Sequence, residues 1–155
     1  MKTLIIYDSA YGNTEKIARA IGGALSGEVS IVRASEADPA KLSALDLLIV
    51  GAPTYGGRPM PSVQKLLERI PKGELQNVSV AAFDTRMGGK SQGFGIRMLT
   101  KALGFAASRI ADSLKDKGGR LLAPPEGFTV KDKEGPLNEG EIERAAAWAR
   151  GMVKA

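Results

Sequence analysis

The stretch Thr3–Glu15, TLIIYDSAYGNTE, decides the interpretation of the whole chain. Its first part, Thr3–Tyr7, is a continuous apolar run, which is typical of a strand buried on both faces of a sheet. A short polar segment with one glycine follows. Apolar residues then recur at helical spacing, at Ile17, Ala20, Ile21, Ala24 and Leu25. The stretch therefore predicts a buried strand, a tight loop and an amphipathic helix in direct succession.

Further short apolar runs alternate with helical patterns along the rest of the chain. The runs are Val29–Arg33, Leu47–Ala52, Val78–Phe83 and Arg120–Ala123, the last resuming at Phe128–Val130 after two prolines. The helical patterns predict one helix over Val63–Ile70 and one long helix over Ile96–Leu114. A last helix is expected with Asn138 as N-cap and Glu141 as its capping-box partner. A short helix is expected over Asp38–Leu45.

This alternation predicts one α/β domain over residues 1–155. The expected architecture is a doubly wound three-layer sandwich with a five-stranded parallel sheet in the order 2-1-3-4-5. In that order a ligand binds at the carboxyl ends of the strands, between strands one and three. The loops after Tyr7, Ala52 and Phe83 are therefore the ones expected to form a site.

Composition narrows the chemistry that such a site could perform. The 155 residues include no Cys and no His, so thiol catalysis, disulfides and the commonest metal ligand are excluded, and no metal site is expected. The net charge of +5 comes from scattered Lys and Arg, and aromatic residues make up only 5%, which does not favour nucleic-acid binding. No apolar stretch is long enough for membrane insertion, and a cytoplasmic protein is expected.

The first loop has the chemistry of an anion site. Gly12 permits a sharp turn, Ser9 and Thr14 offer hydroxyls, and Asn13 offers an amide. The free N–H groups at the start of the following helix add positive partial charge, which suits a terminal phosphate monoester. An ordinary helix N-cap is the alternative interpretation. The spacing of a P-loop and that of a dinucleotide-binding turn are both missing.

Residues 7–15 resemble the phosphate loop of flavodoxins. Ser9, Gly12, Asn13 and Thr14 match that pattern, and Tyr11 lies within it. Ala10 stands where many members carry Thr, but it can still donate its backbone N–H. The resemblance implies FMN as the cofactor.

The second loop resembles the flavodoxin segment that carries an aromatic residue against the flavin ring. The matching residues are Pro53, Thr54, Tyr55, Gly56 and Gly57. The resemblance implies that Tyr55 stacks on the ring and that the Gly56-Gly57 peptide can turn toward the reduced flavin. An ordinary turn, with Pro59 or Pro61 starting the next helix, is the alternative.

The third loop occupies the place where flavodoxins hold the pyrimidine edge of the flavin. Asp84, Thr85 and Arg86 stand there, and Phe94 either covers the ring or anchors the next helix. The second and third loops together carry Arg58, Arg86 and Lys90 against the one acid, Asp84. Such a cationic surrounding would favour the anion that fully reduced flavin forms.

The resemblance implies electron transfer to redox partner proteins, and the basic charge favours partners with acidic surfaces. The alternative is an FMN-dependent oxidoreductase of the quinone-reductase or protoporphyrinogen-oxidase type. A response regulator is excluded because the third strand ends Gly51-Ala52-Pro53, without a phospho-acceptor Asp. The intact phosphate loop disfavours a cofactor-free interaction domain.

Overall fold

The computed structural model describes residues 1–55, 58–88 and 105–153. Its strands are β1 (Lys2–Tyr7), β2 (Glu28–Arg33), β3 (Leu47–Tyr55), β4 (Arg58–Pro59), β5 (Ser79–Met87), β6 (Arg120–Leu121) and β7 (Glu126–Val130). Its helices are α1 (Asn13–Gly23), a 3-10 turn at Ala34–Glu36, α2 (Pro61–Arg69), α4 (Ala106–Asp116) and α5 (Glu141–Val153).

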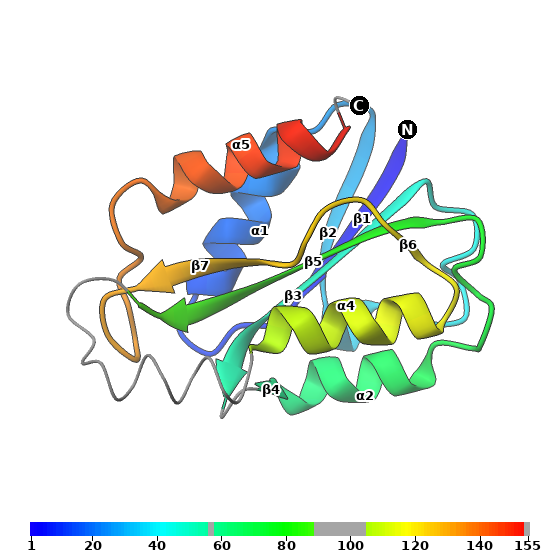
Figure 1. The fold of residues 1–155 in the computed structure, drawn as a ribbon, viewed down its shortest axis with the longest axis horizontal. Coiled ribbons are helices and arrows are strands. Elements are labelled where there is room, and N and C mark those ends of the chain that lie inside the picture. The colour runs from blue at the N-terminus through cyan, green and yellow to red at the C-terminus, as the bar shows by residue number, and fades with distance from the viewer. Residues whose placement is uncertain (56–57, 89–104, 154–155) are drawn as a thin grey trace.

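The sheet has the predicted order (Figure 1). The strands run β2-β1-β3-β5, and both β6 and β7 pair in parallel with β5, so the order 2-1-3-4-5 is confirmed. Two details differ from the predicted five strands. The fifth strand is divided into β6 and β7 around Pro124-Pro125, and the two-residue β4 pairs antiparallel with β3.

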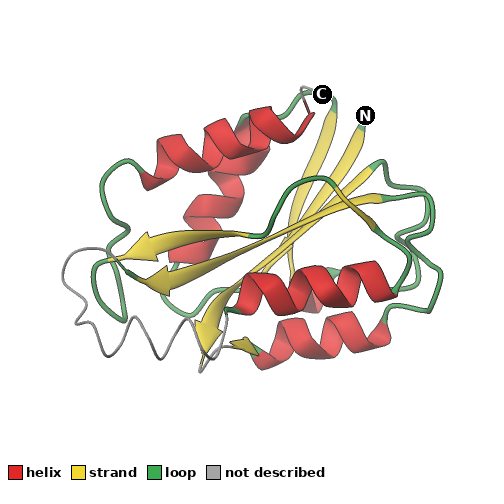
Figure 2. Ribbon diagram, in the orientation of Figure 1, coloured by secondary structure: helices red, strands yellow, loops and turns green. Residues whose placement is uncertain are grey.

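A layer of helices covers each face of the sheet (Figure 2). Helices α1 and α5 lie on one face, and α2 and α4 lie on the other. Successive strand residues point to opposite faces, so Ile49 packs with the α1 and α5 side while Leu48 and Val50 pack with the α2 and α4 side. This is why the central strands are apolar without alternation.

Phe83 on β5 is the centre of an aromatic cluster under α5. Its ring meets Phe128 and Trp148 edge-on, with centroids 6.2 and 6.4 Å away. The ring also lies over the backbone of Gly51 on the neighbouring strand, where an added Cβ would come within 2.1 Å of it. Gly51 is therefore required by this close approach.

The prediction of a short helix over Asp38–Leu45 is wrong. That segment forms turns after the 3-10 helix. The amides of Leu42 and Ser43 donate to the carboxylate of Glu74, at 2.8 and 3.0 Å. This distant side chain satisfies groups that a local helix would otherwise have paired, so tertiary contact overrides the local pattern.

Two predicted helix starts are also wrong. Phe105 has extended backbone, and α4 begins after it, so an unbroken helix over Ile96–Leu114 does not exist; residues 96–104 lie outside the described part. The last helix begins at Glu141, and the Glu141 carboxylate accepts from the amide of Thr129 rather than closing a capping box with Asn138. None of the helices in the described segments has the length and apolar character needed to cross a bilayer.

Replacing Phe83 by Ala is expected to lower the free energy of unfolding by about 3–5 kcal/mol, because it leaves a cavity in the aromatic cluster. Urea denaturation followed by tryptophan fluorescence measures this. Met87→Ala is the matched control on the same strand: Met87 is exposed, and its loss should cost about 0.5 kcal/mol or less. Equal losses in the two variants would contradict the assignment of Phe83 to the core.

Candidate functional site

The carboxyl ends of β1, β3 and β5 meet at one edge of the sheet. Tyr7 pairs with Gly51, Gly51 pairs with Phe83, and Pro53 pairs with Thr85. The loop after β1 therefore lies beside the ends of β3 and β5, at the point where the strand order reverses. This is where doubly wound sheets bind ligands.

The loop between β1 and α1 is a tight turn built around Gly12. Gly12 has a φ of 90°, a left-handed conformation that favours glycine. Its N–H donates to the hydroxyl of Ser9 at 2.8 Å, which closes the turn. Ala10 and Tyr11 form the exposed tip.

Among the described residues, no side chain caps the start of α1. Gly12 is the N-cap residue and has no side chain to accept from the first turn. Lys16 is the first residue whose N–H has a helical acceptor, the carbonyl of Gly12 at 3.1 Å. The amides of the three residues before it, and of Ala10 and Tyr11, find no acceptor among the described residues. A cluster of free donors at a helix N-terminus fits a phosphate group.

Asn13 and Thr14, both predicted from the sequence, are buried at the base of this loop. The Thr14 hydroxyl lies 2.7 Å from that of Thr85 on β5, so the loop is tied to the end of a second strand. One hydroxyl donates to the other, and the accepting hydroxyl keeps its own hydrogen for a further acceptor. The side-chain amide of Asn13 donates to the carbonyl of Glu134 at 3.2 Å, which fixes the segment between β7 and α5 beside the loop.

The second and third predicted loops begin later than the sequence suggested. β3 extends through Pro53 and Thr54 to Tyr55, and β5 extends through Asp84, Thr85 and Arg86 to Met87. The expectation that these residues lie in loops is therefore wrong, because they are strand residues. Pro53 and the β5 residues are held by parallel pairing between β3, β5 and β7, whereas Thr54 and Tyr55 pair antiparallel with β4. Gly56, Gly57 and Phe94 lie outside the described residues.

Asp84 is fully buried and joins β5 to the start of α4. Its carboxylate accepts two hydrogen bonds from Arg86, at 2.6 and 2.7 Å, and one from the amide of Ala107 at 2.9 Å. The hydroxyl of Thr54 accepts from the amide of Ala106 at 3.1 Å. Thr54 and Asp84 thus cap the start of α4, whereas no described side chain caps the start of α1.

The sequence predicted Arg86 as part of a cationic surrounding of the flavin, but its positive charge is engaged by a neighbouring acid. The guanidinium forms a bidentate pair with Asp84, and its carbon lies 3.3 Å from the ring centroid of Phe105. Asp84 neutralises Arg86, so the expectation that Arg86 adds net positive charge around the flavin is wrong. Lys90 lies outside the described residues.

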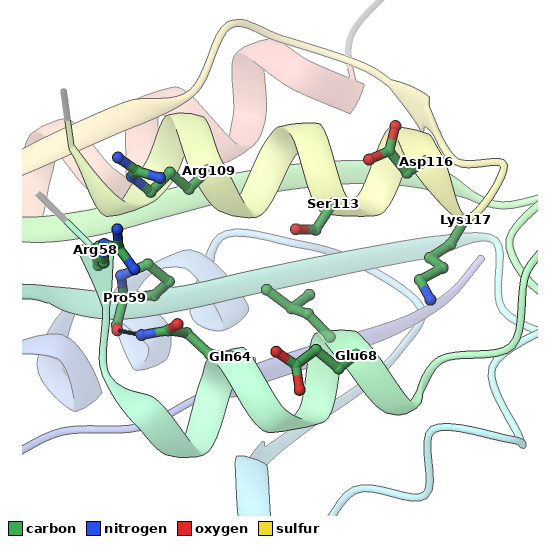
Figure 3. Close-up of a pocket in the computed structure, with 9 residues that line it drawn as sticks. Arg58, Pro59, Gln64, Glu68, Arg109, Ser113, Asp116 and Lys117 are labelled. Carbon is green, nitrogen blue, oxygen red and sulfur yellow. Dashed lines mark hydrogen bonds between the residues drawn. The ribbon is translucent and has the colours of Figure 1, made fainter. Parts of the chain in front are cut away.

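Arg58 belongs to a groove of about 290 Å³ between α2 and α4 (Figure 3). Arg58 and Arg109 lie at one end of this groove, and Lys117 lies at the other. Glu68 and Asp116 also line it. The groove is polar and lies on the α2 and α4 side, away from the free amides of the first loop.

Sequence reasoning missed Asp8 as a central residue of the first loop. Its carboxylate accepts from the amide of Ser9 at 2.9 Å, from Arg33 at 3.0 Å and from the hydroxyl of Ser62 at 2.6 Å. An acid beside a predicted phosphate loop is the signal that could have drawn attention to it. Its partners on β2 and α2 could not be read from local sequence.

A family model described as a flavodoxin domain matches residues 4–122, about three quarters of the chain. The chain belongs to the flavodoxin domain family. No curated protein sequence matches it.

Solved flavodoxins share the fold at low sequence identity. One from the domain Archaea is 18% identical with a TM-score of 0.75, covering 99% of this chain and 97% of that one. Oxidised Flavodoxin 1 from Bacillus cereus is 17% identical with a TM-score of 0.75, covering 99% and 98%. The flavodoxin of Streptococcus pneumonia TIGR4 is 18% identical with a TM-score of 0.76, covering 99% of each chain.

The cofactor of this family is FMN. The first loop of this chain has the chemistry that suits the phosphate end of FMN, because it offers several free amides and buried hydroxyls and needs no cationic side chain.

The free energy of unfolding is expected to depend on pH through Asp84. Burial raises the pKa of this carboxyl, although Arg86, the amide of Ala107 and the hydroxyl of Thr54 act in the opposite direction. An acid with a higher pKa in the folded state stabilises the fold below its unfolded pKa of about 4, and this contribution is lost as pH rises. The Asp84→Asn variant carries a neutral side chain of the same shape at every pH.

The stability of the wild type relative to Asp84→Asn should therefore fall as the pH is raised from 4 to 8. Urea denaturation of both proteins across that range measures the difference. Ser113→Ala, on α4 and without a titratable group, should give a constant difference. A wild-type advantage that grows with pH would show that the pair with Arg86 outweighs burial.

Proposed function

We propose that this protein is an electron-transfer flavoprotein that carries FMN at the carboxyl ends of β1, β3 and β5. The observation that carries the proposal is the uncapped start of α1, with free backbone donors at the point where the strand order reverses. The start of α4 lies at the same edge but is capped by Thr54 and Asp84. In the described part of the chain, the start of α1 thus leaves several backbone amides available for an anion.

In this proposal the loop from Ser9 to Thr14 binds the terminal phosphate through its backbone amides. Thr14 and Thr85 provide the hydroxyl that hydrogen-bonds it, and Asn13 holds the loop in shape through Glu134. Tyr55, the last residue of β3, is the residue that we expect to stack on the ring system. FMN, when bound, supplies reversible one-electron and two-electron transfer.

Transfer between proteins is favoured over catalysis by this chain alone. The sequence contains no His and no Cys, so the commonest proton-transfer and nucleophilic groups are missing. Asp84, an acid at the end of β5, has its carboxylate engaged by Arg86 and the start of α4. The positive net charge, together with Arg58 at the β4 end of the groove, suits redox partners with acidic surfaces.

Thr14→Ala is expected to weaken FMN binding by about 1–3 kcal/mol, because it removes a hydrogen bond to a charged group. Tyr55→Ala should cost about 1 kcal/mol through lost stacking. Titration of apoprotein with FMN, followed by quenching of flavin fluorescence, measures both. Ser113→Ala is the control, since it removes a hydroxyl from the groove and should leave the affinity unchanged. Unchanged affinity in both test variants would locate the FMN site elsewhere.

The purified holoprotein is expected to release FMN on denaturation, as identified by chromatography. With NADPH and the soluble quinone menadione it should show no turnover above that of an equal amount of free FMN. Saturable quinone reduction by the holoprotein alone would overturn the electron-carrier proposal in favour of an FMN-dependent oxidoreductase. Recovery of FAD would overturn the cofactor assignment.

A further inference from the structure

Two acidic side chains flank the first loop, which is an unexpected arrangement beside an anion site. Asp8 is the first residue of the loop, and Glu15 lies in the first turn of α1. A carboxylate near a bound anion repels it, and partly buried carboxylates are screened less by salt than exposed ones. An unpaired carboxylate in the loop would therefore weaken the binding of an anion there.

Arg33, the last residue of β2, contacts both acids. One of its guanidinium nitrogens lies 3.0 Å from the Asp8 carboxylate, and another lies 3.6 Å from the Glu15 carboxylate. The guanidinium also lies over the ring of Tyr7, at 5.3 Å from the centroid. Three contacts from three places in the fold fix this cation beside the loop.

The Asp8 carboxylate can compete with a ligand for the loop amides. Its Oδ1 already accepts from the amide of Ser9, and the next two amides along the chain, those of Ala10 and Tyr11, have no acceptor among the described residues. Arg33 on Oδ1 and Ser62 on Oδ2 hold the carboxylate away from them. Without Arg33, the carboxylate has both the charge and the position to turn toward the free amides.

We infer that Arg33 is a positioning residue for the anion site: by holding Asp8 in an ion pair, it keeps the amides of the first loop free for the phosphate group. The inference rests on the proposed function, in which that group belongs to FMN. Arg33 acts through Asp8 and does not itself contact the ligand. The effect of losing Arg33 should therefore depend on whether Asp8 is present.

A double-mutant cycle tests this dependence. Wild type, Arg33→Met, Asp8→Asn and the double variant are titrated with FMN and with riboflavin, which lacks the phosphate. Arg33→Met should weaken FMN binding about tenfold, the size expected for one uncompensated charge in partly solvated surroundings. In the Asp8→Asn background the same change should have little effect. Riboflavin affinity should be similar in all four proteins.

The control for the loss of a positive charge is Arg19→Met. Arg19 pairs with Glu15 at 2.9 Å on the exposed face of α1 and does not contact Asp8, so its loss should leave FMN affinity close to that of wild type. Arg33→Lys keeps the charge and should restore most of the affinity. Thermal melts of each variant, followed by circular dichroism, identify any that fail to fold.

Three outcomes would overturn the inference. Equal loss from Arg33→Met in both backgrounds would mean that Arg33 attracts the ligand directly. Equal losses for FMN and riboflavin would mean that Arg33 only supports the fold. An FMN affinity of Arg33→Met equal to that of wild type would mean that Asp8 leaves the loop amides free without an ion pair to Arg33.

Failure of the proposed function gives a different result, namely wild-type protein that binds neither FMN nor riboflavin. In that case the inference is tested with inorganic phosphate, followed by NMR shifts of the amides of Ala10, Tyr11 and Thr14. The same order of affinity among the four proteins, now measured for phosphate, would support the inference. Identical shifts in all four would overturn it.

Discussion

Burial of the central strands on both faces is the constraint from which the remaining structure follows. Leu48 and Ile49 are neighbours on β3 that point in opposite directions, and both are fully buried. A sheet of this kind needs a helical layer on each side, and parallel strands need helical crossovers to connect them. These connections bring the carboxyl ends of β1, β3 and β5 to one edge, which is where the polar loops collect.

Helices α1, α2 and α4 begin at that edge, and the first turns of α1 and α4 are paired differently. The amides of Ala106 and Ala107, at the start of α4, are satisfied by Thr54 and Asp84 from the ends of two strands. The first turn of α1 follows Gly12, which has nothing to offer as a cap. Unpaired amides near the interior are unfavourable unless they meet solvent or a ligand, and this is the reason that we propose an anion site at the start of α1.

The charged side chains near this edge form ion pairs and do not form a patch of one sign. Arg86 is bound to Asp84 and stacked on Phe105, and Arg33 is bound to Asp8 and Glu15. Each cation is thereby fixed in place and largely neutralised. The positive net charge of the chain is therefore a weak guide to the electrostatic field at the proposed flavin site.

The sequence by itself determined the strand order, the faces of α1 and α2, and the position of the tight loop between β1 and α1. These features depend on local periodicity and on short motifs, as in Thr3–Thr14, where the residues that act together are neighbours in the chain. Only the tertiary structure decided where β3 and β5 end, where α4 and α5 begin, and which acid meets which cation. Glu74 pairs the amides of a segment predicted as a helix, and Asp84 caps a helix far along the chain. Arg33 at the end of β2 reaches Asp8, which follows the neighbouring strand β1. Such pairings depend on which strand ends and helix starts become neighbours, and that information exists only once the sheet has formed.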